Sequence, residues 1–188
     1  MIEAVFVSEN IPEFTDVEAD SWYETAVNYI VRSGILSGTS SETFSPGLSV
    51  TRAEAIMLFY QMEGDPKVSM KNPFSDVPDG ESYTDAVIWA ASRGIVKGID
   101  ADTFAPDLPI TREQLVTVLY RYARSLKKSS FADLSGFGDV DSISGYAANA
   151  MKWAVNAGII KGMYGELVPQ GAATRAQVAV VVMRLKQE

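Results

Sequence analysis

Gly94-Ile95-Val96-Lys97-Gly98, followed by Thr111-Arg112-Glu113-Gln114, is the stretch that decides the fold, because the chain contains it three times. The other two copies are Gly34-Ile-Leu-Ser-Gly38 with Thr51-Arg-Ala-Glu54, and Gly158-Ile-Ile-Lys-Gly162 with Thr174-Arg-Ala-Gln177. The arginines of copies one and two are 60 residues apart, and those of copies two and three are 63 apart. Repetition at this length predicts a fold assembled from three equivalent supersecondary units.

A first helix is predicted in each copy, ahead of the first glycine. In copy one, apolar residues recur with a helical period over residues 22–31, and Ser21 with Glu24 forms a capping-box pair. A glycine at the end of such a pattern is typical of a left-handed helix C-cap. The glycines in this position are Gly34, Gly94 and Gly158.

A second helix is predicted from the threonine of each Thr-Arg phrase. Thr51 with Glu54 fits the capping box, and the pairs Thr111–Gln114 and Thr174–Gln177 fit it equally. The residues that follow are apolar on most of the helix circumference, which is typical of a helix inside a core. We therefore expect the three second helices to meet centrally, with the first helices and the loops outside them.

The composition excludes several classes of function. The chain has 188 residues and is 47% hydrophobic, so it can bury one core, and helix pairs of this size are too small to stand alone. It contains no Cys and no His, which excludes disulfides, thiolate zinc sites and Ser-His or Cys-His nucleophiles. A net charge of -8 argues against nucleic acid as a partner.

Membrane and secretion signals are weak in this sequence. No stretch approaches the roughly 20 apolar residues that a spanning helix needs, so no membrane span is predicted. Residues 1–7 are too short, and lack the charged start, for a secretion signal. The chain is nevertheless interpreted as a fragment of a larger secreted protein.

The arginine of the Thr-Arg phrase has two interpretations. Capping does not need it, and a cation at this end of a helix is slightly unfavourable. One interpretation is an anion site, in which Arg and the helix-terminal N–H groups bind a carboxylate or phosphate. The other is a structural pair with an aspartate of the Phe-x-Asp-Val phrases. The arginines are Arg52, Arg112 and Arg175, and the aspartates are Asp16, Asp76 and Asp139.

Aromatic and glycine residues are the next candidates. Trp22 and Tyr146 occupy one aligned position, where copy two has a serine, so this position is expected near the surface and suits a sugar ring. Trp89 and Trp153 are expected to fill the core.

The second glycines of the phrase allow a tight turn, the favoured interpretation, or close approach of a ligand to the backbone. These glycines are Gly38, Gly98 and Gly162.

No catalytic residues, metal ligands or cofactors are predicted. The paired aspartates in the loops each lack an equivalent in at least one other repeat, and no unique polar cluster surrounds them. Asp100, Asp102 and Asp107 do not have the spacing of an EF-hand calcium loop. The chain is therefore expected not to be an enzyme, and a wall hydrolase is a distant third hypothesis.

Together, the ordered phrases resemble tandem S-layer homology repeats over residues 14–188. Each copy has Phe-x-Asp-Val, a helix with Trp or Tyr, Gly-Ile-x-x-Gly, a Thr-Phe-x-Pro loop that is weaker in copy three, and Thr-Arg-Ala-Glu or a variant of it. The resemblance implies a mostly α fold, a pseudo-threefold spindle with a central three-helix bundle. It divides the chain into an N-terminal extension and three repeats within one compact unit: 1–13, 14–66, 74–126 and 137–188. Polar linkers are predicted over 63–72 and 127–135.

The resemblance also implies a function, the non-covalent anchoring of an exported protein to the bacterial cell envelope. The implied partner is a secondary cell-wall polysaccharide or another peptidoglycan-linked glycan, often pyruvylated, bound in grooves between repeats. The arginine is a groove residue of the family, so a ketal carboxylate favours the anion-site interpretation. The implied location is extracellular, at the cell wall or S-layer. The implied glycan-binding residues are Arg52, Arg112, Arg175, Asp16, Asp76, Asp139, Trp22, Tyr146, Gly38, Gly98 and Gly162.

Two points qualify this hypothesis. Glu113 stands where the family usually has Ala, and its charge beside Arg112 is expected to weaken that groove. Copy three has Gln177, a shortened loop and Leu167 in place of Phe, so the grooves are expected to be unequal, with only one or two that bind. The alternative function is a structural module for self-assembly or protein interaction in a surface layer.

Overall fold

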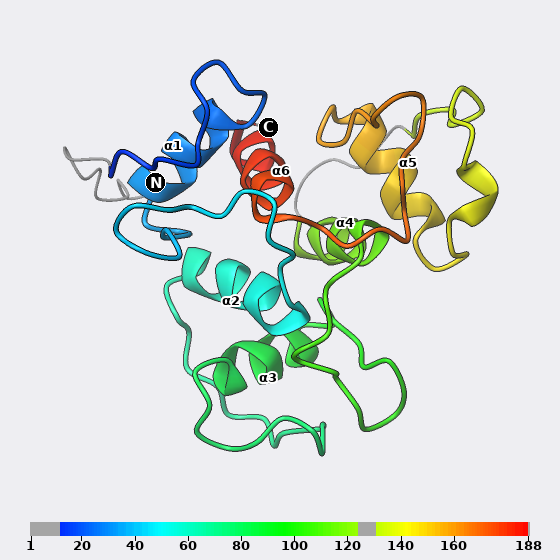
Figure 1. Cartoon of the computed structure of the whole chain (residues 1–188). Coiled ribbons are helices and arrows are strands. Elements are labelled where there is room, and N and C mark those ends of the chain that lie inside the picture. Colours follow the sequence, from blue (N-terminus) through cyan, green and yellow to red (C-terminus); the bar gives the residue numbers. More distant parts are fainter. Residues whose placement is uncertain (1–11, 124–130, 188) are drawn as a thin grey trace. The chain divides into compact units, whose positions relative to one another are not determined.

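The structure is a computed structural model that describes residues 12–123 and 131–187. Within these ranges the chain is helical, with isolated β-bridges and no strand, as predicted (Figure 1). The helices are α1 (Glu24–Arg32), α2 (Arg52–Met62), α3 (Thr84–Ser92), α4 (Arg112–Tyr122), α5 (Ala148–Asn156) and α6 (Arg175–Gln187), with a 3-10 turn at Val140–Ser142. Residues 1–11 of the predicted N-terminal extension and 127–130 of the second predicted linker lie outside the described residues.

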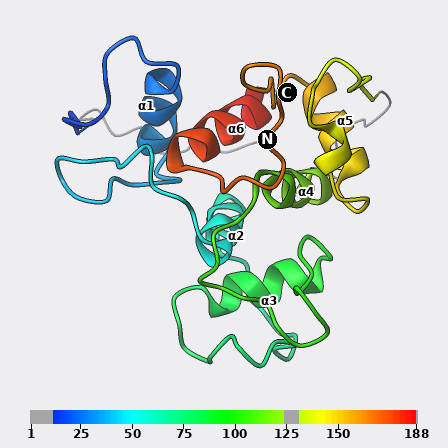
Figure 2. The same ribbon diagram turned by 45° about the vertical axis from the view of Figure 1, so that its right-hand side comes forward.

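The chain folds as two compact units. One contains α1 and α6, from the segments that end at Ser49 and begin at Thr174, and the other runs from Val50 to Ala173. In each unit the second helix of one repeat packs against the first helix of another: α6 on α1, α2 on α3, and α4 on α5 (Figure 1; Figure 2). The helices of a single repeat are therefore not each other's main partners. The central three-helix bundle and the spindle stay predictions.

Aromatic stacking explains the two helix pairs of the second unit. The Trp89 ring on α3 lies 5.6 Å from the Tyr60 ring on α2, and the Trp153 ring on α5 lies 5.5 Å from the Tyr120 ring on α4. Both tryptophans are 4% exposed, which confirms that they fill the core. Tilted rings at such distances add to the stabilisation that burial alone provides.

The second helices begin as predicted. The Thr51 hydroxyl accepts a hydrogen bond from the Glu54 N–H, and the Glu54 carboxylate accepts one from the Thr51 N–H. The pairs Thr111–Gln114 and Thr174–Gln177 make the same reciprocal bonds. The three capping boxes are therefore confirmed.

The predicted start of the first helix is wrong. Helix α1 begins at Glu24 itself, after Tyr23, which makes no side-chain cap. The Glu24 carboxylate accepts from the Asp20 N–H, and the buried Ser21 hydroxyl has no hydrogen-bond partner in the described part of the chain. The end of the helix is as predicted, because Gly34 has φ +67°, and Gly94 and Gly158 have nearly the same value.

A backbone junction joins the three copies just before their second helices. The Val50 N–H donates to the Ala173 carbonyl, the Ala173 N–H to the Ile110 carbonyl, and the Ile110 N–H to the Val50 carbonyl, at 2.8–2.9 Å. All three residues belong to the second unit and are 2% exposed or less. This cycle of hydrogen bonds holds together the three residues that directly precede the Thr-Arg phrases.

Candidate functional site

Each arginine of the Thr-Arg phrases bonds to the loop of a different repeat. The Arg52 Nε donates to the Phe104 carbonyl at 2.9 Å, and its Nη2 donates to the Lys97 carbonyl at 3.3 Å. Arg52 is 8% exposed, and its guanidinium carbon lies 4.7 Å from the centroid of the Phe104 ring. The Arg52 side chain therefore packs into the loop of the second repeat, although Arg52 belongs to the first repeat.

Arg175 repeats this geometry within the first unit. Its Nε donates to the Phe44 carbonyl at 2.7 Å, its Nη2 donates to the Ser37 carbonyl, and it lies 4.6 Å from the Phe44 ring centroid. Among the described residues, the Arg112 side chain makes the Nε bond alone, to the Leu167 carbonyl at 2.8 Å. Because Leu167 has no ring, Arg112 lacks the cation–π contact of the other two arginines.

The aspartates support the loops that receive the arginines. Asp76 accepts hydrogen bonds from the N–H groups of Phe104 and Ala105, at 2.7 and 2.6 Å. Ala105 has φ +59°, a left-handed conformation that is costly for a residue with a side chain, so the carboxylate stabilises a strained turn. Asp16 binds the turn at Phe44 and Ser45, and Asp139 the turn at Leu167 and Val168.

This arrangement corrects the structural interpretation of the arginines. The aspartates use both carboxylate oxygens on backbone N–H groups, and the arginines bond to backbone carbonyls, so the predicted direct pairing is wrong. Asp76 still acts on Arg52 through space. Burial lowers the pKa of Arg52, and the nearby Tyr146 and Asp76 oppose this effect. Arginine nevertheless remains charged at neutral pH.

The helix-terminal N–H groups are not available for an anion. The Arg52 N–H donates to the Leu108 carbonyl and the Ala53 N–H to the Pro106 carbonyl, while the third N–H binds the Thr51 hydroxyl. The α4 and α6 termini make the same backbone bonds to their loops. The prediction that these N–H groups form the anion site is therefore wrong, and only the guanidinium side of the site is left to bind a ligand.

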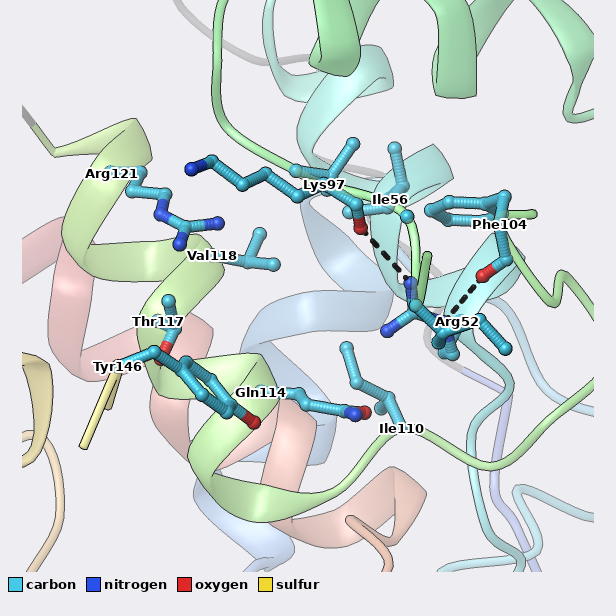
Figure 3. A pocket seen from close by; sticks show the side chains of 13 residues that line it. Arg52, Ile56, Lys97, Phe104, Ile110, Gln114, Thr117, Val118, Arg121 and Tyr146 are labelled. Carbon is cyan, nitrogen blue, oxygen red and sulfur yellow. Dashed lines mark hydrogen bonds between the residues drawn. The ribbon is translucent and has the colours of Figure 1, made fainter. Parts of the chain in front are cut away.

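A pocket of about 380 Å³ lies beside Arg52 in the second unit (Figure 3). Three cationic side chains line it, Arg52, Lys97 and Arg121, and no Asp or Glu of the described residues does. The Arg52 Nη1 has no hydrogen-bond partner in the described part of the chain, and Figure 3 shows the guanidinium at the edge of the pocket. A chain with net charge -8 thus has a cationic pocket. Its other lining residues are Ile56, Val96, Gly98, Ile99, Phe104, Ile110, Gln114, Thr117, Val118 and Tyr146.

Tyr146 is placed as expected, at the surface, and Trp22 is exposed as well. Tyr146 is 54% exposed and lines the Arg52 pocket. Trp22 belongs to the first unit, is 63% exposed and makes an edge contact with Tyr23. Tyr146 and Arg52 therefore line the same pocket, although they belong to different repeats.

Glu113 does not have the surroundings that the sequence suggested. Its side chain is 1% exposed, and its carboxylate accepts from the Tyr146 hydroxyl at 2.8 Å and from the Ser144 N–H at 2.9 Å. Burial lowers the pKa of Arg112, and the carboxylate that opposes this effect is Asp139. The Glu113 charge is thus directed to the third repeat.

The second glycines of the phrase lie where the packing leaves no room for a side chain. A Cβ at Gly38 would lie 2.5 Å from the Phe14 ring, and one at Gly162 would lie 2.6 Å from the Phe137 ring. A Cβ at Gly98 would lie 2.5 Å from two backbone oxygens. These positions need glycine for packing, and Gly98 also lines the pocket.

The sequence did not single out Lys97, Arg121 and Phe104 as lining residues. Phe104 has an aromatic equivalent in copy one and Leu167 in copy three, which is a signal that this position differs between sites. Lys97 and Arg121 are 24 residues apart and converge only through the fold, so no spacing rule could have found them.

Comparison with known proteins agrees with this architecture. The S-layer homology domain matches residues 13–56, 73–116 and 136–179, which is more than half of the chain, and the chain belongs to this family. An exoglucanase of Acetivibrio thermocellus is 30% identical over 179 residues, which are 93% of this chain and 16% of that protein. The 125 kDa surface-layer protein of Lysinibacillus sphaericus is 30% identical over 85% of this chain and 14% of its own length.

The S-layer protein sap of Bacillus anthracis is 25% identical over 93% of this chain and 21% of its own length. The chain thus spans about a fifth or less of these relatives. The family and its surface-layer members indicate a location at the cell surface or in an S-layer, consistent with cell-wall anchoring. Among the described residues, no helix combines the length and apolar character needed to cross a membrane.

Proposed function

We propose that this chain anchors its protein non-covalently to the bacterial cell wall by binding an acidic secondary cell-wall polysaccharide. The observation that carries the proposal is the cationic pocket beside Arg52, in a chain that is otherwise acidic. Its volume of about 380 Å³ is within the range of small-ligand pockets, so it is large enough for a sugar residue. The acidic group that we expect is a carboxylate, such as that of a pyruvate ketal.

Arg52 and Tyr146 have complementary roles in this proposal. The open Nη1 of Arg52 binds the carboxylate, since a charge-assisted hydrogen bond is about twice as strong as a neutral one. The half-exposed ring of Tyr146 packs against the apolar face of the sugar. Asp76 and Phe104 act indirectly, because they hold the loop and the guanidinium in place.

The other implied residues follow by analogy within the chain. Arg175 is proposed as a second glycan site, because it has the same Nε bond and aromatic contact as Arg52. Arg112 is proposed as the weakest, because Leu167 replaces the aromatic ring. Trp22 is proposed as a further sugar contact. Asp16 and Asp139, like Asp76, are proposed to position loops, and Gly38 and Gly162 to allow the turns that the loops need.

The experiment is co-sedimentation of the protein with purified sacculi, before and after acid extraction of the wall polysaccharide. We expect binding that disappears on extraction and is strongly reduced by Arg52→Ala. Arg32→Ala is the matched control, because it removes the same charge from an exposed position of α1. Binding that survives extraction would instead indicate peptidoglycan as the ligand.

No catalytic role is proposed for this chain, because relatives such as the exoglucanase are much longer than the part that it matches. The alternative function, self-assembly in a surface layer, predicts oligomers that form with increasing protein concentration and no response to the polysaccharide. Sedimentation velocity without sacculi distinguishes the two, because the anchoring proposal does not require any association between chains.

A further inference from the structure

Glu113 is the buried charge that the proposed function leaves unexplained. It is 1% exposed, whereas a buried carboxylate is costly unless hydrogen bonds replace its water. The equivalent residues of the other two repeats are Ala53 and Ala176, so the fold of a repeat does not need an acid here. A role specific to this position is therefore indicated.

In the part of the chain that the structure describes, every hydrogen bond to the Glu113 carboxylate comes from the third repeat. The Ser144 N–H donates to one oxygen at 2.9 Å and the Tyr146 hydroxyl to the other at 2.8 Å. Burial raises the pKa of Glu113, but the hydrogen bonds from Ser144, Tyr146 and Gln170 together leave it below its ordinary value. Glu113 is thus an ionised acceptor at neutral pH.

The same segment is held by Gln170, whose side-chain amide donates to the Ser142 carbonyl at 3.0 Å and contacts the Ser144 hydroxyl at 3.3 Å. The Tyr146 hydroxyl and the backbone that precedes Tyr146 are therefore held in place, while the residue remains 54% exposed. Figure 3 shows this ring on the α4 side of the pocket, beside Thr117 and Gln114.

We propose that Glu113 is a positioning residue for the glycan: it holds the Tyr146 ring in place as a wall of the Arg52 pocket. This inference rests on the proposed function. All three repeats then contribute to one pocket: the first provides the arginine, the second the positioning carboxylate and the third the aromatic wall. Trp22 and Ser82 occupy the Tyr146 position in the other repeats, whose Thr-Arg phrases have Ala53 and Ala176 at the position of Glu113.

The expected effect is a moderate loss of affinity when the ring is released. Ordering one mobile side chain on binding weakens an interaction roughly 2- to 10-fold. Glu113→Ala and Tyr146→Phe should each have this effect, because one removes the acceptor and the other the donor. Glu113→Gln should retain most of the affinity, since its amide oxygen and nitrogen can bond to Ser144 and Tyr146.

The test titrates the full chain with wall polysaccharide released from sacculi by acid, followed on the NMR signal of the Arg52 Nε–H. The double variant Glu113→Ala with Tyr146→Phe should bind no more weakly than either single variant, because both break the same contact. A Tyr146→Phe variant that binds like the wild type would overturn the proposal. So would variants that lower the melting temperature at unchanged affinity.

A second measurement reports the contact itself. Burial, followed by the hydrogen bond and the charge of Glu113, raises the pKa of the Tyr146 phenol to about 12. In Glu113→Ala this pKa should fall toward the ordinary value, as followed by NMR of ring-labelled tyrosine.

If Arg52→Ala abolishes wall binding while the Glu113 variants do not change it, the positioning role fails and the proposed function stands. If Arg52→Ala also has no effect, the proposed function itself fails.

Discussion

Arg52 and Arg112 begin equivalent helices of the same unit, and comparing them separates the scaffold of this fold from the part that differs between sites. Both arginines donate an Nε hydrogen bond to the carbonyl of a loop in the next repeat. In both loops an aspartate binds two successive N–H groups, the second of which belongs to a left-handed residue. These shared contacts build the connection between repeats.

The differences lie on the outer side of the guanidinium. Arg52 has the Phe104 ring, a second carbonyl from Lys97 and a pocket with two further cations. Arg112 contacts Leu167 and is not among the residues that line this pocket. We therefore propose that each repeated arginine is structural through its Nε, and that the surroundings of its terminal nitrogens decide whether a ligand binds.

The largest expected effect concerns the shared scaffold. Asp76→Ala and Asp139→Ala should each lower the free energy of unfolding by roughly 3 kcal/mol, because each removes two hydrogen bonds to a charged acceptor. Urea denaturation measures this loss, with Asp107→Ala, an exposed position in a loop, as the control. A large difference between the two variants would show that the scaffold is not shared.

The next effect separates the two arginines by binding. Arg52→Ala should weaken binding to wall polysaccharide by about 10- to 100-fold, as expected for the loss of a charge-assisted contact worth roughly 1.5–3 kcal/mol. Arg112→Ala should weaken it by less than about 3-fold. Isothermal titration calorimetry measures both, and circular dichroism confirms that the variants are folded. Equal losses would contradict the assignment of the pocket.

A smaller effect exchanges the aromatic residue between the two sites. Phe104→Leu should weaken binding at Arg52, and Leu167→Phe should strengthen binding at Arg112, each by at least about 2- to 5-fold, because a cation–π contact contributes roughly 0.5–1 kcal/mol at exposed sites and more between buried groups such as these. Titrations followed on the Nε–H signals of the two arginines resolve the sites. An unchanged affinity in both variants would show that the aromatic ring does not determine the difference between the two sites.

The smallest effect is a pH dependence of stability that comes from Glu113. Burial raises the pKa of Glu113, but its hydrogen bonds outweigh this and leave the folded value below the ordinary 4.5. The stability that these bonds contribute is therefore complete above the unfolded pKa and is lost as the pH falls through the folded value. Thermal unfolding between pH 7 and pH 3 should show a weaker acid dependence in Glu113→Gln, and an identical dependence would contradict this.

The features predicted from the sequence are those set by neighbouring residues. The capping boxes at Thr51, Thr111 and Thr174 need only four residues, and Gly34 ends its helix because of its own backbone conformation. The burial of Trp89 and the exposure of Tyr146 followed from comparing the copies. Each of these properties is repeated within the chain, which makes it visible in a single sequence.

The features that were missed depend on which repeat meets which. Periodicity within one repeat does not say that α2 packs on α3, nor that the N–H groups of Arg52 and Ala53 are already bonded to Leu108 and Pro106. The bond between Glu113 and Tyr146 joins residues that are 33 apart. Backbone hydrogen bonds and contacts between repeats leave no local pattern in the sequence, so they could be found only in the three-dimensional structure.

The central claim is that Arg52 binds the carboxylate of a wall glycan, and its most direct test is a double cycle on protein and ligand. Wild-type chain and Arg52→Ala are each titrated with extracted polysaccharide and with the same polysaccharide after reduction of its carboxylates to alcohols. We predict that reduction weakens binding to the wild type at least about 10-fold and hardly changes binding to Arg52→Ala. Equal sensitivity of the two proteins to reduction would contradict the claim.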